Sequence, residues 1–188
     1  MDDLTVRILL ECEKKVTENL TPEERFKYFL GRMQYLKYRS GKENFAEADC
    51  SGSVCLALLM ATGYSIRVTA DDLYRRFFTK RNPDKDTIQA AFVTTLYDRQ
   101  FGARRYKAGE VCHVAGVCGK GVVLNCVEPR SYLRDLHDFT AYYQANDYTV
   151  HVRGLDMEAL KKASEEDNSL FGADEEFLDL KKALTEAR

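Results

Sequence analysis

Residues 49–63 read DCSGSVCLALLMATG, and this stretch decides how the rest of the chain is interpreted. Its apolar run ends at Gly63, a residue type that commonly terminates helices, so the stretch predicts a buried helix with Cys50 at its start. The positive end of a helix dipole stabilises a thiolate, and a nearby histidine can pair with one. Cys50 is therefore a candidate nucleophile; a structural thiol buried at a helix start is the alternative.

The segments on either side of this helix predict a mixture of helices and strands. Upstream, residues 21–24 (TPEE) have the form of a capping box, which predicts a helix that continues to Leu36. Downstream, β-rich runs within residues 111–127 flank the sequence GKG at 119–121 and predict a hairpin, and residues 148–152 predict a further strand.

Composition and charge exclude several classes of protein. The chain has 188 residues, with 28 Lys and Arg against 30 Asp and Glu, for a net charge of -2. This balance argues against a protein that binds nucleic acids or anionic membranes. The longest apolar stretch, residues 54–61, is too short for a membrane span, and the acidic start of the chain does not resemble a signal peptide. We therefore expect a cytoplasmic location with reduced cysteines, unless another protein or cell lysis carries the chain out.

Three histidines could serve as a general base for Cys50. His113 lies in the β-like run VCHVAGV, where a strand would hold the imidazole in place. His137 lies in a charged stretch and is expected at the surface, and His151 has no orienting partner nearby in the sequence. His113 is therefore the candidate base, and a satisfied core histidine is the alternative.

Asn125 is the candidate for the third group that orients the base. If the hairpin loop holds three residues, 118–120, His113 lies directly opposite Asn125, whereas a two-residue loop turns Asn125 to the other face of the sheet. Gly119 and Gly121 suit the three-residue loop, so the first register is predicted. An ordinary hairpin residue is the alternative reading of Asn125.

Taken in order, these residues resemble the motifs of the NlpC-type cell-wall peptidases. Residues 49–52 (DCSG) match the quartet of that family, residues 113–117 (HVAGV) match its histidine strand, and Asn125 matches the polar third residue. Residues 38–41 (YRSG) resemble its Tyr-x-x-Gly element. The resemblance covers about residues 26–128.

The resemblance implies an α+β, papain-like fold in which N-terminal helices, including the nucleophile helix, pack on an antiparallel sheet. It also implies that Cys50 attacks an amide carbonyl, that His113 takes and returns the proton, and that Asn125 orients the imidazole. The reaction would require no cofactor and no metal.

The resemblance further implies three substrate-binding residues. Tyr38 would line the site, with backbone N–H groups near the helix start holding the oxyanion. In members of the family that require a free amino terminus, the positions matching Asp49 and Ser51 help to bind that amine.

On this basis the chain is expected to be a hydrolase, specifically a thiol protease acting on cell-wall peptides, either cytoplasmic or phage-associated. The bond expected to be cut joins D-γ-glutamate to a diamino acid in peptidoglycan, so the partner is a peptide or peptidoglycan fragment. Two alternatives are an amidase or acyltransferase that uses the same Cys–His pair, and a catalytically silent binding or assembly module.

The expected domain organisation is a peptidase domain over residues 1–154 and an acidic helical extension over residues 155–188. The extension holds ten acidic and five basic side chains and is either a solvated helical appendage or an acidic interaction tail. Residues 67–107 hold ten basic and five acidic side chains, and this excess either binds an acidic substrate or is simply solvated.

Overall fold

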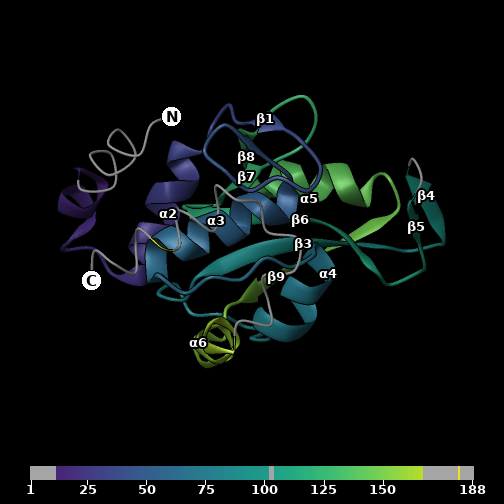
Figure 1. Ribbon diagram of the computed structural model, residues 1–188. Helices are drawn as coiled ribbons and strands as arrows, with labels where there is room; N and C mark the ends of the chain where they lie inside the picture. Colours follow the sequence, from purple (N-terminus) through teal and green to yellow (C-terminus); the bar gives the residue numbers. More distant parts are fainter. Residues whose placement is uncertain (1–11, 102–103, 167–181, 183–188) are drawn as a thin grey trace.

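A five-stranded antiparallel sheet, in the order β8-β7-β6-β3-β9, forms the centre of the structure (Figure 1). The computed structural model describes residues 12–101, 104–166 and 182. The strands of the sheet are β3 (Gln89–Thr95), β6 (Val111–Gly119), β7 (Val122–Asn125), β8 (Tyr132–Asp135) and β9 (Tyr148–Gly154). The strand predicted over residues 148–152 is therefore confirmed as part of β9.

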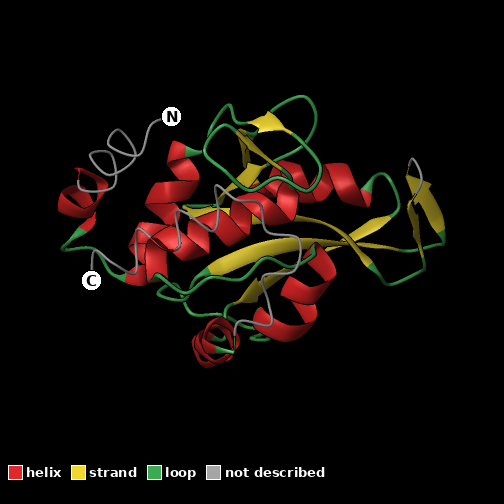
Figure 2. Ribbon diagram, viewed as in Figure 1, coloured by secondary structure: helices red, strands yellow, loops and turns green. Residues whose placement is uncertain are grey.

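Helices cover both faces of this sheet (Figure 2). On one face lie α2 (Pro22–Arg32), α3 (Cys50–Thr62), α4 (Ala70–Asp72) with the π-helical turn η1 (Leu73–Phe77), and α6 (Met157–Glu165). On the other face lies α5 (Leu136–Gln144), whose Phe139 is fully buried. The α+β architecture expected from the sequence is confirmed.

The helix predicted from the capping box is α2, but it ends at Arg32, and the prediction that it continues to Leu36 is wrong. Thr21 accepts a hydrogen bond from the Glu24 N–H, and the Glu24 side chain accepts one from the Thr21 N–H at 2.8 Å. Leu30 packs so closely on Gly116 of β6 that a Cβ at that glycine would overlap it. The absence of a side chain at Gly116 therefore lets α2 lie directly on the sheet.

The helix predicted from residues 49–63 is α3, with Cys50 as its first residue. Asp49 caps it, and Gly63 ends it in the left-handed conformation, with φ of 72°. A Cβ at Gly52 would overlap the carbonyl oxygen of Lys42. The missing side chain thus allows the preceding loop to pack against the first turn of the helix.

Two small sheets lie outside the central one. In the first, β1 (Lys37–Tyr38) pairs in parallel with β2 (Glu47–Ala48), just before α3. In the second, β4 (Arg99–Phe101) pairs with β5 (Arg104–Tyr106) in an antiparallel ribbon that projects from one end of the molecule (Figure 1).

The hairpin between β6 and β7 exists, but its predicted register is wrong. Val117 pairs with Val123 rather than with Gly121, and the turn consists of Lys120 and Gly121, both at positive φ. Cys118 forms a bulge, because the next pair after Val117 is Gly119 with Val122. The observed partner of Val117 is thus two residues beyond the predicted one. Because side chains alternate between the two faces of a strand, a shift of two residues leaves each side chain on the face where it was predicted.

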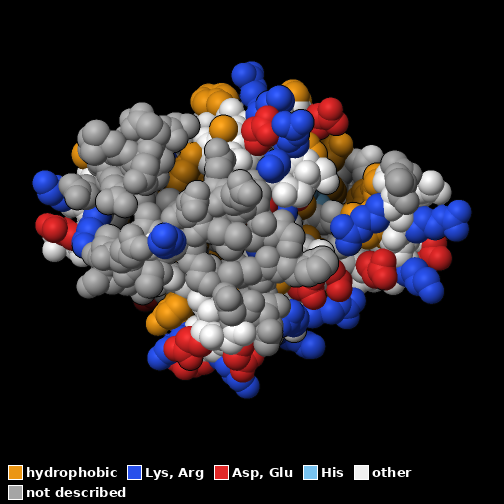
Figure 3. Space-filling view, in the orientation of Figure 1, with side chains coloured by type: hydrophobic (Ala, Val, Ile, Leu, Met, Phe, Trp, Pro, Cys, Tyr) orange, Lys and Arg blue, Asp and Glu red, His pale blue; other side chains and the backbone are white. Residues whose placement is uncertain are grey.

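Helix α6 lies in the segment that the sequence assigned to a C-terminal extension. Leu155, Leu160 and Ala163 join the core on the α3 face, and the Ser65 N–H donates to the Ser164 hydroxyl at 2.9 Å. Figure 3 shows acidic and basic side chains side by side on the surface around this helix. The remainder of the predicted extension, apart from residue 182, lies outside the described residues, and the domain division stays a prediction.

None of the helices in this described part of the chain is both long and apolar enough to cross a membrane.

Candidate active site

Cys50 begins α3 beside the open edge of β6. Strand β7 pairs with β6 only from Gly116 onward, so the edge at Val114 is free to receive the start of the helix. The backbone N–H groups of Val114 and Ser51 donate toward the Cys50 sulfur. The candidate nucleophile therefore contacts the backbone of the residue that follows the candidate base.

His113 and Asn125 are joined by a hydrogen bond. The His113 Nε2 and Asn125 Oδ1 atoms are 2.8 Å apart, and the two side chains are 8% and 2% exposed. Asn125 Nδ2 in turn donates to the Tyr132 hydroxyl at 2.9 Å, which fixes the amide orientation and leaves Oδ1 facing the imidazole. Oδ1 can only accept, so Nε2 carries the proton and Nδ1 is left as the basic nitrogen.

The contact between His113 and Asn125 is diagonal rather than direct. Continuing the observed register places Asn125 opposite Ala115, which is two residues from His113 and on the same face. The prediction that the two residues lie directly opposite each other is wrong, because the bulge at Cys118 was not foreseen. The prediction that they lie close together is confirmed.

Aromatic rings enclose the imidazole from the α5 side of the sheet. The His113 ring stacks on Tyr143 with centroids 5.8 Å apart, and the Phe139 ring lies 6.2 Å away. Burial lowers the pKa of His113 to about 4, although the Asn125 hydrogen bond and the Asp49 charge oppose this shift. The imidazole is therefore neutral at pH 7 and can accept a proton.

The Cys50 thiol is also neutral at pH 7. Burial, together with the charge of Asp49, raises its pKa to about 12, and the N–H groups of Val114 and Ser51 only partly oppose this rise. The sequence favoured a thiolate stabilised by the helix start, but the cost of desolvating the charge outweighs that stabilisation. The resting site thus holds a thiol and an imidazole rather than an ion pair.

Tyr38 comes from β1 and lies beside the nucleophile. It packs partly buried against the core cluster that also contacts Cys50. Burial, together with the nearby charge of Asp49, raises the pKa of its hydroxyl to about 12. The hydroxyl stays protonated over the physiological range and can donate a hydrogen bond at this position.

Asp49 has both carboxylate oxygens engaged within the protein. Oδ1 accepts from the Gly52 N–H at 2.6 Å and from the Ser51 hydroxyl at 3.0 Å. Oδ2 accepts from the Gly41 N–H at 2.7 Å and from Arg67 Nη2 at 3.0 Å. The carboxylate therefore joins the helix start to the loop before it, and its role toward a substrate amine stays a prediction.

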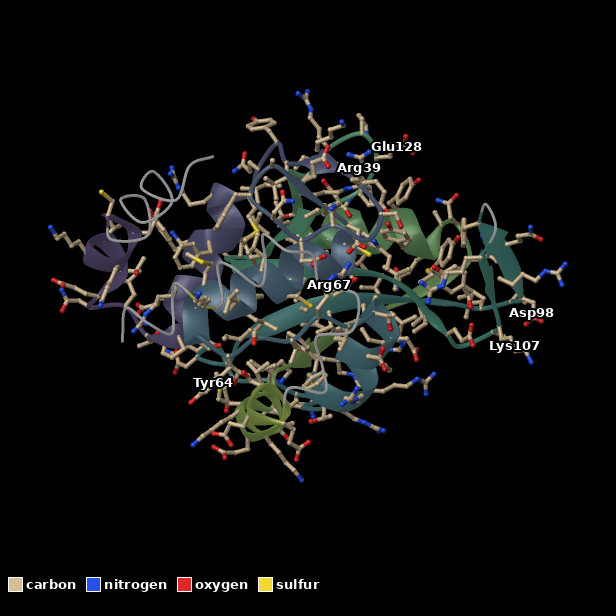
Figure 4. The ribbon with its side chains drawn as sticks, viewed as in Figure 1. Arg39, Tyr64, Arg67, Asp98, Lys107 and Glu128 are labelled. Carbon is tan, nitrogen blue, oxygen red and sulfur yellow. The ribbon has the colours of Figure 1, made fainter. Side chains whose placement is uncertain are left out.

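Arg67 occupies the centre of this buried polar cluster, beside α3 (Figure 4). Its Nε donates to Glu43 Oε2 at 2.6 Å, and its Nη1 donates to the Ser51 hydroxyl at 3.1 Å. Glu43 is fully buried, Arg67 is 8% exposed and Ser51 is 6% exposed. Ser51 thus also bonds within the protein, and the cluster holds the first turn of α3 in place.

Comparisons with known proteins identify the fold. No protein-family model matches the sequence, and no curated protein matches it. Among solved structures, NlpC1 from Trichomonas vaginalis is similar, with a TM-score of 0.51 at 17% identity, over 72% of this chain and 44% of that one. NlpC2 from the same organism gives a TM-score of 0.52 at 17% identity, over 72% and 46% of the two chains. The fold is of the NlpC type. The chain spans less than half the length of these two proteins.

Within this NlpC-type fold, the structure joins His113 to Asn125 by a hydrogen bond, and it places the Val114 backbone and the Tyr38 side chain near Cys50. The chemical roles assigned to them remain proposals. Of the residues that the structure describes, no group of three or more His, Cys, Asp or Glu side chains is arranged to hold a metal ion.

Three residues of the site were not found from the sequence. Tyr132 meets Asn125 only because β8 pairs with β7, with those two residues opposite each other. Tyr143 reaches His113 from α5, in a stretch that carried no motif. Arg67 has carboxylate partners, Glu43 and Asp49, that are distant from it in sequence.

Proposed function

We propose that the chain is a cysteine peptidase that hydrolyses an amide bond in peptidoglycan-type peptides, of the D-γ-glutamyl–diamino acid class. The observation that carries this proposal is the hydrogen bond between His113 and Asn125, next to a cysteine at a helix start. The NlpC-type fold supports it. A nucleophile, a base and a group that orients the base are the parts that amide hydrolysis by a thiol requires.

In the first half of the reaction, Cys50 Sγ bonds to the amide carbonyl carbon while His113 Nδ1 takes the thiol proton. Because the thiol and imidazole are neutral at rest, deprotonation accompanies attack rather than preceding it. Asn125 accepts from Nε2–H throughout and stabilises the imidazolium that forms. The Tyr38 hydroxyl and backbone N–H groups at the helix start are the donors proposed for the oxyanion.

In the second half, the C–N bond breaks and His113 gives its proton to the leaving amine. A water molecule then attacks the thioester, with His113 removing one water proton. Collapse of that intermediate releases the acid and returns the proton to Cys50. Protons and electrons balance with water as the only co-reactant.

The identity of the product tests the proposal. Purified protein is incubated with an L-Ala-γ-D-Glu-diamino acid peptide and with its α-linked isomer, and products are identified by mass spectrometry. We expect cleavage after D-Glu in the γ-linked peptide and little in the isomer. Transfer of the acyl group to an added amine instead of water would indicate the acyltransferase alternative.

The neutral thiol favours one other candidate, a catalytically silent binding or assembly module. A thiol whose pKa is raised is unreactive at neutral pH unless a base assists it. If the chain is such a module, we expect that neither peptide is cleaved. We also expect iodoacetamide to modify Cys50 no faster than Cys55, a fully buried cysteine of the same helix.

A further inference from the structure

The β4–β5 ribbon carries aromatic and basic side chains that the proposed reaction does not use. Between residues 99 and 107 the chain holds four basic side chains and no acidic one. Figure 3 shows Lys and Arg side chains gathered at this end of the molecule beside hydrophobic ones, and Figure 4 labels Asp98 and Lys107, which lie just before and just after the ribbon.

The two faces of the ribbon differ. Phe101 pairs with Arg104 and Arg99 pairs with Tyr106, so these four side chains share one face. Arg105 pairs with Gln100 between them and points to the opposite face.

The face with Arg104 connects to the catalytic imidazole through a row of rings. Phe101 lies 5.7 Å from Tyr106 and 6.4 Å from Tyr148, between ring centroids. Tyr148 lies 5.6 Å from Tyr143, which stacks on His113 at 5.8 Å. Tyr106 is partly buried, and burial raises the pKa of its hydroxyl although the charge of Arg104 opposes this shift.

Arg104 is the cation on this face that is available to a ligand. Its guanidinium carbon lies 4.8 Å from the centre of the Tyr106 ring, and the side chain is exposed. Within the described residues, no carboxylate lies within salt-bridge distance of it. By contrast, Arg99 donates to the Asn146 carbonyl at 2.9 Å and pairs with Asp147 at 3.4 Å.

We propose that Arg104 binds a carboxylate on the acyl part of the substrate, so that the enzyme selects peptides with a free α-carboxylate next to the scissile γ-amide. A guanidinium fork matches a carboxylate in two parallel hydrogen bonds, whereas a neutral amide at the same position loses the charge and half of that geometry. Phe101 and Tyr106 supply the apolar surface against which the peptide lies. This inference rests on the proposed function and adds to it the charge of the preferred substrate.

The test compares Arg104→Gln with Arg105→Gln, its matched control on the opposite face. Each variant and the wild type are assayed on the γ-linked peptide with a free D-Glu α-carboxylate and on the same peptide with an α-carboxamide. We expect Arg104→Gln to raise KM for the acid about threefold to tenfold, with kcat and the amide little changed. Arg105→Gln should change neither substrate. Equal losses in the two variants, or equal losses on the two peptides, overturn the proposal.

A second readout keeps this inference separate from the proposed function. The rates at which iodoacetate and iodoacetamide modify Cys50 are compared by mass spectrometry, since only the first reagent carries a carboxylate. We expect Arg104→Gln to lower the iodoacetate-to-iodoacetamide ratio about threefold relative to Arg105→Gln. If neither peptide is cleaved but this ratio falls, the proposed function fails while the carboxylate site stands. An unchanged ratio contradicts the carboxylate site whether or not cleavage occurs.

Discussion

Lowering the pH from 7 to 4 should destabilise the folded protein through His113. In the fold its imidazole is buried and its pKa is about 4, against an ordinary value of 6.5. Between these two values the unfolded chain binds the proton and the folded one does not, so the free energy of unfolding falls as the pH falls. At 1.36 kcal/mol per pKa unit, this pKa shift corresponds to about 3 kcal/mol of unfolding free energy. That stability is fully present above pH 6.5 and is lost as the pH approaches 4.

Urea unfolding at several pH values measures this loss, with His113→Gln as the variant that cannot titrate. Carboxylates that titrate below pH 5 contribute equally to the two proteins. The difference between the wild type and the variant in how the free energy of unfolding changes with pH therefore comes from His113. The wild type should lose about 3 kcal/mol more than the variant between pH 7 and pH 4. Parallel slopes, or an NMR titration of His113 with a pKa near 6.5, would refute a desolvated imidazole.

Three further substitutions test other parts of the structure. Arg67→Met leaves the charges of Glu43 and Asp49 without their guanidinium, so it should cost about 3–5 kcal/mol of unfolding free energy, measured in urea; a loss below about 1 kcal/mol would contradict a buried network. Asn125→Ala removes the group that orients His113 and should lower kcat about 100-fold with little change in KM; an unchanged kcat would remove Asn125 from the mechanism. Gly31→Ala, in α2 with open space around it, should stabilise the protein by about 0.5–1 kcal/mol, and a lower Tm would contradict this.

The helices that carry the site could be predicted because their signals are local. The capping box at Thr21 and Glu24 and the glycine at position 63 lie within the helices that they begin or end. The position of Cys50 at a helix start follows from residues next to it in the sequence. Local hydrogen bonds and local backbone conformations determine these features, so a single sequence contains the necessary information.

The parts that could not be predicted depend on contacts between distant segments. The bulge at Cys118 changes the register without leaving a distinctive residue pattern. Tyr132 joins the His113–Asn125 pair only through the pairing of β8 with β7. The raised pKa of Cys50 likewise follows from how deeply the fold buries the helix start, which the sequence of α3 does not specify.

The rate of peptide cleavage in two cysteine variants tests most directly whether Cys50 is the nucleophile of an amide hydrolase. Cys50→Ala removes the proposed nucleophile, whereas Cys112→Ala removes a second partly buried free thiol that lies next to His113 in the sequence. We expect the wild type and Cys112→Ala to cleave the γ-linked peptide at similar rates and Cys50→Ala to show no cleavage. Cleavage that persists in Cys50→Ala, or that is absent from the wild type, would contradict this role of Cys50.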